Sequence, residues 1–207
     1  MSKIKFSFTC LASLTLAFVA FASRADPSAS DEISRLAALM HWRPGSIVAD
    51  IGAGDGRYAF AAVQHVGPSG KVFATEIDAS KLTELRAEVK KRNLQNVLIL
   101  ESKEADSNLP PECCDAIFLR RVYHHLTKPA EFDCALVRSL KPGGRLAILD
   151  FPPRKGLDPV EGVPANRGGH GIPQNIVVEE LTAAGLQLEK TLNDWPENSY
   201  CLLFVKK

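Results

Sequence analysis

The residues best suited to chemistry lie in a glycine-rich run, Asp-Ile-Gly-Ala-Gly-Asp-Gly, at positions 50–56. Gly52 and Gly54 let the main chain turn sharply and approach a ligand where any Cβ atom would collide with it. The helix predicted to follow offers free N–H groups at its start. Asp50 precedes the first glycine by two residues, where a carboxylate can bind the ammonium group of an amino-acid moiety. This turn therefore predicts a ligand with a cationic aminoacyl end.

Spacing separates this turn from a dinucleotide-binding turn. The dinucleotide pattern is Gly-x-Gly-x-x-Gly, but here Arg57 stands at the third glycine position and the glycine comes one residue earlier, at Gly56. Glu76 follows at 76 − 56 = 20 residues, at the end of a predicted strand, where an acid can accept hydrogen bonds from ribose hydroxyls. The turn and the acid together predict an aminoacyl nucleoside and disfavour a nicotinamide-dependent reductase.

Short apolar segments alternate with helical patterns along the chain, which predicts an α/β fold with a mostly parallel sheet covered on both faces. Strands are predicted at 46–51, 71–77, 96–100, 115–119, 145–150, 186–192 and 199–205, and helices at 31–40, 55–66, 80–92, 130–140 and 173–184. The last two strands are joined by a connection too short for a crossover, so one strand near the edge of the sheet should be antiparallel.

These motifs resemble those of class I S-adenosylmethionine-dependent methyltransferases, specifically the small-molecule branch that includes quinone-biosynthesis C-methyltransferases. Besides the glycine turn and Glu76, the resemblance rests on Leu109-Pro110, Asp115 and the run Leu-Lys-Pro-Gly-Gly at 140–144. It covers about residues 33–207. It implies a Rossmann-like, doubly wound sheet of seven strands, adenosylmethionine as the cofactor, and methyl transfer to a small or medium acceptor.

The resemblance also assigns residues to the cofactor. It places the glycines at the methionine part, Glu76 at the ribose and Ile77 against the adenine. A polar side chain after the third strand should meet the adenine amino group, and we favour Asp106 over Glu104 for this role. The complete predicted cofactor set is Asp50, Gly52, Ala53, Gly54, Gly56, Glu76, Ile77, Asp106 and Arg120.

Methyl transfer from a sulfonium depends mainly on alignment, and it needs a general base only when the acceptor carries a proton. The fourth strand runs into Arg-Arg-Val-Tyr-His-His at 120–125. Tyr123 and His124 are the predicted acceptor-side residues of this run. The alternative is that one histidine packs in the structure while the other caps the next helix. The two arginines either bind an anionic acceptor or pair with surface carboxylates.

The segment at 151–172, rich in glycine and proline, is predicted to form a long loop, and long ordered loops in compact domains are usually functional. Asp150 and the part of this loop at 152–170 are predicted to form a lid. Within the loop, a cation and an imidazole stand among glycines at 167–171, and glycines permit closure over a ligand. His170 is therefore the third predicted acceptor-side residue. No Cys or His spacing indicates a metal site.

The first 25 residues differ from the rest of the chain. Lys3 and Lys5 precede an uncharged stretch at 6–22. The small residues Ser23 and Ala25 occupy the −3 and −1 positions of a cleavage site before residue 26. This pattern predicts a secretory signal peptide at 1–25 and one methyltransferase domain at 26–207, exported to the periplasm or the exterior. The alternative is an uncleaved membrane anchor, with the domain outside in either case.

The bulk composition fits a single globular domain, and the resemblance implies a small-molecule acceptor as its partner. The net charge of +1 over 207 residues gives no support to a nucleic-acid partner. The cysteines outside the predicted signal peptide are predicted to be small buried thiols, although an exported domain can pair such cysteines in disulfides. They are Cys113, Cys114, Cys134 and Cys201. Because adenosylmethionine is made in the cytosol, an exported protein that binds the nucleoside without catalysis is the alternative function.

Overall fold

The computed structural model describes residues 27–207, so the predicted signal peptide lies outside the described part of the chain. Seven strands follow the predicted order: β1 Ile47–Ile51, β2 Lys71–Glu76, β3 Val97–Glu101, β4 Cys114–Arg120, β5 Leu140–Asp150, β6 Leu186–Trp195 and β7 Ser199–Lys206. The α-helices are α1 Pro27–Leu39, α2 Arg57–Val66, α3 Ala79–Lys91, α4 Pro129–Ser139 and α5 Gln174–Ala183. Three short 3₁₀ helices complete the described elements: η1 Tyr123–His125, η2 Ala165–Arg167 and η3 Pro196–Asn198.

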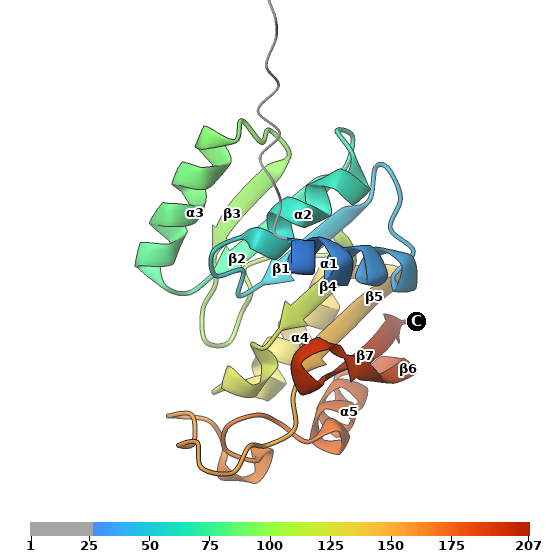
Figure 1. Ribbon diagram of the computed structural model, residues 1–207. Helices are drawn as coiled ribbons and strands as arrows, with labels where there is room; N and C mark the ends of the chain where they lie inside the picture. Colours follow the sequence, from blue (N-terminus) through green and yellow to red (C-terminus); the bar gives the residue numbers. More distant parts are fainter. Residues whose placement is uncertain (1–26) are drawn as a thin grey trace, which may run out of the picture.

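The strands form one twisted sheet in the order β3-β2-β1-β4-β5-β7-β6 (Figure 1). All neighbouring pairs from β3 to β5 are parallel, whereas β7 is antiparallel to both β5 and β6. The predicted α/β architecture with one antiparallel strand inserted near the edge is thus confirmed. The short hairpin between β6 and β7 explains this insertion, because a tight connection can only join antiparallel neighbours.

Side chains of the central strands alternate between two hydrophobic clusters, one on each face of the sheet. On β4, Phe118 belongs to the cluster covered by α1, α2 and α3, while Ile117 and Leu119 belong to the cluster covered by α4 and α5. Figure 1 shows α1 and α2 in front of the sheet and α4 behind it. Since both faces are buried, the central strands read as continuous apolar segments, which is the pattern seen in the sequence.

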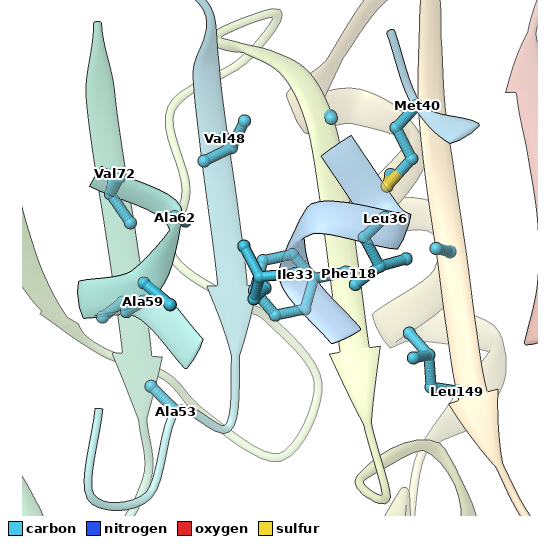
Figure 2. Packing of buried hydrophobic residues seen from close by; sticks show 14 of the residues in the cluster. Ile33, Leu36, Met40, Val48, Ala53, Ala59, Ala62, Val72, Phe118 and Leu149 are labelled. Carbon is cyan, nitrogen blue, oxygen red and sulfur yellow. The ribbon is translucent and has the colours of Figure 1, made fainter. Parts of the chain in front are cut away.

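Helix α1 begins at Pro27, four residues before the predicted start at residue 31. Ala29, Ile33, Leu36 and Met40 are spaced three or four residues apart and are all buried. Figure 2 shows Ile33, Leu36 and Met40 in front of the strands that carry Val48 and Phe118. The apolar stripe thus extends one turn further toward the N-terminus, and burial of this turn lengthens the helix.

Strand β5 begins at Leu140, earlier than the predicted start at residue 145. Cys114 pairs with Leu140 while Ala116 pairs with Arg145, so the run Lys-Pro-Gly-Gly at 141–144 forms an irregularity within the ladder. A bulge adds residues to one strand without ending it, and the periodicity of the sequence gives no sign of this.

The topology places the site at the carboxyl ends of the parallel strands. β1 lies between β2 and β4, so the chain winds in opposite directions on its two sides, and ligands of open α/β sheets bind at such a switch point. The long segment between β5 and α5 also lies at this edge of the sheet (Figure 1). Among residues 27–207, no helix is long and apolar enough to cross a membrane.

Candidate functional site

The glycine turn between β1 and α2 has three glycines in the left-handed region, with φ of 69° at Gly52, 57° at Gly54 and 78° at Gly56. A Cβ atom at Gly52 would lie 2.6 Å from Val122, and one at Gly56 would lie 2.6 Å from Phe60. At Gly54, by contrast, a Cβ atom would meet nothing within 4 Å. Gly52 and Gly56 are therefore needed for close packing, whereas Gly54 faces open space.

Two adjoining cavities are lined in part by this turn, with volumes of about 570 and 350 Å³. Gly52, Gly54, Arg120 and Arg121 line both. The larger, which we call the nucleoside cleft, is also lined by Ile51, Glu76, Ile77, Lys81, Ser102, Lys103, Glu104, Val122, His125, Leu126, Thr127 and Phe132. The smaller, the aminoacyl cavity, is also lined by Asp50, Ala53, Asp55, Arg57, Tyr58 and Glu197.

Glu76 fixes the junction between the glycine turn and the end of β2. One carboxylate oxygen accepts a hydrogen bond from the Gly54 N–H at 3.0 Å, and the other accepts from the Ile77 N–H at 2.8 Å. Glu76 is buried, while the neighbouring Ile77 is 56% exposed, an unusual state for a large apolar side chain. A carboxylate beside an exposed apolar surface fits a ribose joined to a planar base.

Asp50 lies at the other end of the turn and is 3% exposed. Its Oδ2 atom has no hydrogen-bond partner among the described residues. Burial raises the pKa of Asp50 to about 8, and the nearby Glu76 and Asp55 carboxylates add to this effect. The group is therefore protonated at neutral pH in the free protein, and an arriving ammonium group would favour its ionised form. This unpaired oxygen fits the predicted aminoacyl ligand.

Replacing Asp50 with asparagine is expected to stabilise the protein at high pH. A pKa raised from 3.8 to about 8 means that Asp50 contributes stability below pH 3.8, and that this contribution is lost as the pH rises through 8. Asn cannot ionise, so the variant avoids the cost of a buried charge at high pH. The change in Tm caused by Asp50→Asn should therefore be a few degrees more positive at pH 9 than at pH 5. Thermal unfolding followed by circular dichroism would measure this difference.

Asp55→Asn is the matched control, because an ion pair with Arg57 lowers the pKa of Asp55 instead. This second variant should show no such gain at pH 9. An equal change in Tm for Asp50→Asn at both pH values would show that Asp50 is ionised in the folded protein, contrary to the expectation.

Arg120, at the end of β4, contributes to both cavities, yet an internal partner already holds its guanidinium. Its Nε and Nη2 atoms donate to the carboxylate of Glu32, both at 3.0 Å. Glu32 also accepts from the Trp195 indole at 3.0 Å and from the Tyr58 hydroxyl at 3.1 Å. Although burial opposes it, hydrogen bonds from Arg120 and Trp195 hold the pKa of Glu32 below its usual range. We call these four residues the Glu32 network.

Of the predicted acceptor-side residues, Tyr123 lies away from both cavities. Its ring is fully buried, and its hydroxyl lies 2.9 Å from both Asp133 and Glu180. Burial, together with these two carboxylates, holds the pKa of Tyr123 far above its usual range. The structure thus places Tyr123 in a buried polar cluster beneath the site.

His124 is buried and held by Asp150, the last residue of β5. Its Nδ1 atom lies 2.9 Å from one Asp150 oxygen, and its main-chain N–H donates to the other at 3.1 Å. The rings of His124, His125 and His170 form a cluster, with centroids 4.0 Å apart for the first pair and 5.5 Å apart for His124 and His170. The structure therefore brings His170 of the predicted lid to the histidines of η1.

His125, which the sequence analysis did not select, is the histidine that lines the nucleoside cleft. Desolvation, with a smaller effect from His124, lowers the pKa of His125 to about 4, so its ring is uncharged at neutral pH. The sequence offered two adjacent histidines, but only the geometry of the 3₁₀ turn decides which of them faces the cleft.

Asp106 and Glu104 occupy different surroundings. Both oxygens of Asp106 accept hydrogen bonds from Arg138 at 3.0 Å, and Asp106 does not line either cavity. Glu104 lines the nucleoside cleft together with Ser102 and Lys103. A short turn pairs Lys103 with Asp106 and sends the two acids in different directions. Glu104, the second choice from the sequence, is thus the acid of this pair that lines the nucleoside cleft.

Gly56 likewise lies outside the lining of both cavities. It is the residue that precedes α2, and a Cβ atom added there would collide with Phe60 and Leu85.

Among residues 27–207, no group of three or more His, Cys, Asp or Glu side chains is arranged to hold a metal ion. The four cysteines in this range are free thiols; Cys114 and Cys201 are buried as predicted, whereas Cys113 is half-buried and Cys134 is exposed, so the prediction was wrong for these two.

Comparison with known proteins agrees with this geometry. The family model described as a methyltransferase domain matches residues 49–148, the stretch from β1 to β5 that contains the glycine turn and Glu76. A crystal structure of an adenosylmethionine-dependent methyltransferase from Aquifex aeolicus superimposes with a TM-score of 0.72 at 26% identity, covering 88% of this chain and 95% of that one. In fold and in sequence, the chain is therefore similar to class I adenosylmethionine-dependent methyltransferases.

Among curated proteins, the chain is similar to a ubiquinone/menaquinone biosynthesis C-methyltransferase of Francisella philomiragia, with 34% identity over 115 residues. This match covers 53% of this chain and 44% of the relative. An arsenite methyltransferase of Halobacterium salinarum is 29% identical over 122 residues, covering 56% of this chain and 31% of the relative. The chain thus spans less than half the length of these two relatives. The cofactor of this class of methyltransferase is adenosylmethionine.

Proposed function

We propose that this protein transfers a methyl group from adenosylmethionine to a small or medium-sized acceptor molecule. The observation that carries the proposal is the pair of carboxyl groups at the two ends of one glycine turn. Glu76 is anchored to the turn at the nucleoside cleft, while Asp50 keeps an unpaired buried oxygen at the aminoacyl cavity. Such a pair matches a ligand with ribose hydroxyls at one end and an ammonium group at the other.

When bound, adenosylmethionine supplies an activated methyl group on a sulfonium centre. The protein contributes position: Asp50 holds the ammonium group, Glu76 the ribose hydroxyls and Ile77 one face of the adenine. Glu104 and Ser102 lie where the edge of the base can be bound. Correct alignment of this kind can supply about 7–11 kcal/mol of the barrier reduction.

The acceptor binds beside His125, at the carboxyl ends of β4 and β5. An uncharged imidazole can accept a hydrogen bond from an acceptor hydroxyl. Behind it, Asp150 orients His124, whose ring contacts that of His125 at an interplanar angle of 40°, with centroids 4.0 Å apart. His170 and Phe151 cover the same cluster from the loop that follows β5. These groups favour a small acceptor with a hydroxyl group next to the carbon or oxygen that is methylated.

We further propose that the domain acts outside the cytoplasm. This proposal rests on the N-terminal pattern of two lysines, an uncharged apolar stretch and small residues before position 26. Cleavage would leave a mature chain that begins at Asp26, next to the first described helix. Intact-mass measurement of protein recovered from the native host would give the mature length, and a full-length cytoplasmic product would contradict the proposal.

The experiment that tests the activity combines titration with turnover. Adenosylhomocysteine and adenosylmethionine should bind the protein with Kd values below about 1 mM, the upper end of usual KM values. With radiolabelled adenosylmethionine, a panel of phenols, hydroquinones, carboxylic acids and thiols should yield labelled product with at least one hydroxyl-bearing acceptor. Absence of binding for both nucleosides at millimolar concentrations would contradict the proposed function.

A further inference from the structure

Three non-glycine residues with left-handed backbone conformations meet at the edge of the aminoacyl cavity. Arg121 has φ of 56°, and Glu197 and Asn198 in the β6–β7 connection have φ of 58° and 57°. Such conformations are strained for side chains other than glycine and often occur at binding sites and switches. Glu197 lines a cavity whose other residues come from β1, the glycine turn, α2, the end of β4 and Arg121.

Glu197 forms ion pairs with Arg120, the last residue of β4, and with Arg121, which follows it. One carboxylate oxygen contacts the guanidinium of Arg121, and the other lies 3.6 Å from Nη2 of Arg120. The Glu197 side chain is 58% exposed, so it can turn out into solvent without leaving a buried site. The Nε atom of Arg121 is buried and has no hydrogen-bond partner among the described residues. Arg121 thus retains an unused donor beside an easily displaced partner.

The three arginines that line the aminoacyl cavity differ in how firmly their carboxylate partners hold them. Arg120 is bound through two donors to Glu32, which is 5% exposed and accepts two further hydrogen bonds. Arg57 is bound to Asp55, its neighbour in the turn. Arg120 also lies 3.6 Å from Glu197, but Arg121 is the lining arginine whose closest carboxylate partner is Glu197, on a separate, exposed hairpin. An amino-acid moiety that places its ammonium at Asp50 also brings a carboxylate that requires a cation.

We propose that Arg121 binds the carboxylate of the cofactor's amino-acid moiety, and that Glu197 is an internal carboxylate that competes for the same guanidinium. This inference rests on the proposed function, because it assumes an aminoacyl nucleoside as ligand. The hairpin between β6 and β7 then acts as a latch, in which Glu197 releases Arg121 when the ligand carboxylate enters. A nucleoside without an amino-acid moiety meets no such competition.

The test compares two nucleosides, adenosylhomocysteine and 5′-methylthioadenosine, by isothermal titration calorimetry with the full chain. 5′-Methylthioadenosine has the adenosine and the sulfur but lacks the amino-acid end. Glu197→Gln keeps the size of the side chain and removes its charge. This variant should bind adenosylhomocysteine about three- to fivefold more tightly than the wild type, with unchanged affinity for 5′-methylthioadenosine. A modest gain is expected because exposed ion pairs are weak.

Arg121→Gln completes a double-mutant cycle. It should weaken adenosylhomocysteine binding by about tenfold or more and leave 5′-methylthioadenosine binding unchanged. In the double variant, the gain from Glu197→Gln should vanish, because the two residues act through one contact. Glu189→Gln is the matched control, since Glu189 pairs with Arg145 on the surface and lines neither cavity.

The outcomes separate this inference from the proposed function. If the wild type binds adenosylhomocysteine but Glu197→Gln and Glu189→Gln leave its affinity equally unchanged, the latch is wrong while the cofactor assignment stands. The latch is also wrong if Glu197→Gln tightens both nucleosides alike, or if its gain persists without Arg121. Binding of neither nucleoside by the wild type would overturn the proposed function and the latch together.

Discussion

Gly54→Ala is expected to weaken adenosylhomocysteine binding by at least about thirtyfold while the protein remains folded. A Cβ atom at this position meets no protein atom within 4 Å, so it extends into the space shared by the nucleoside cleft and the aminoacyl cavity. The φ of 57° adds a backbone penalty of about 1–2 kcal/mol for a residue with a side chain. Titration calorimetry and thermal unfolding would measure the two effects separately.

Gly143→Ala provides the matched control for backbone strain. Gly143 also has a positive φ, 74°, and a Cβ atom there would likewise meet nothing within 4 Å, but it lies at the opposite edge of the sheet, before the regular part of β5. Both variants should lose a similar few degrees of Tm, and only Gly54→Ala should lose binding. If the two variants bound adenosylhomocysteine equally well, the turn would not be the cofactor site.

Arg167→Met is expected to have the largest effect on stability, a loss of about 3–5 kcal/mol in the free energy of unfolding, because it breaks a buried ion pair. Arg167 is 1% exposed and donates to Glu180 at 2.9 and 3.0 Å. It also donates to the carbonyl groups of Leu126 and Tyr123. Without the guanidinium, the Glu180 carboxylate faces Asp133 with only the Tyr123 hydroxyl between them.

Denaturant unfolding would measure this loss, with Arg145→Met as the control. Arg145 is bound to Glu189 through two donors on the surface, where such pairs contribute about 1 kcal/mol or less. Limited proteolysis should also cut the segment between β5 and α5 faster in Arg167→Met, because Arg167 ties this segment to η1 and α5. Equal stability of the two variants would contradict a structural role for the buried cluster.

The sequence predicted the features that follow from local patterns. The alternation of apolar segments and helices fixes the order of the elements, and the short final connection fixes the antiparallel strand. The glycine turn and Glu76 were found because backbone conformation and chain length determine their spacing. Both lie at the carboxyl ends of neighbouring parallel strands, so their meeting at 3.0 Å follows from the topology.

The features that the sequence did not predict depend on contacts between distant segments. Arg167 stood out as a cation among glycines, yet its burial depends on Glu180 and Leu126, 13 and 41 residues away in the chain. The choice between Glu104 and Asp106 depends on Arg138, which lies 32 residues beyond Asp106. The selection of His125 over Tyr123 depends on how a single 3₁₀ turn is oriented over the sheet. Periodicity and motif spacing contain none of this information.

The Glu32 network has a consequence for how the domain can be divided. Glu32 comes from the first described helix and Trp195 from the final hairpin. Glu32 accepts a hydrogen bond directly from the Trp195 indole, and it also binds Arg120, which lines both cavities. The stretch that matches the methyltransferase domain, 49–148, contains neither Glu32 nor Trp195. An excised fragment of that length would contain the glycine turn and Glu76 but would leave the guanidinium of Arg120 without Glu32, so we expect it to lose the ordered wall of both cavities.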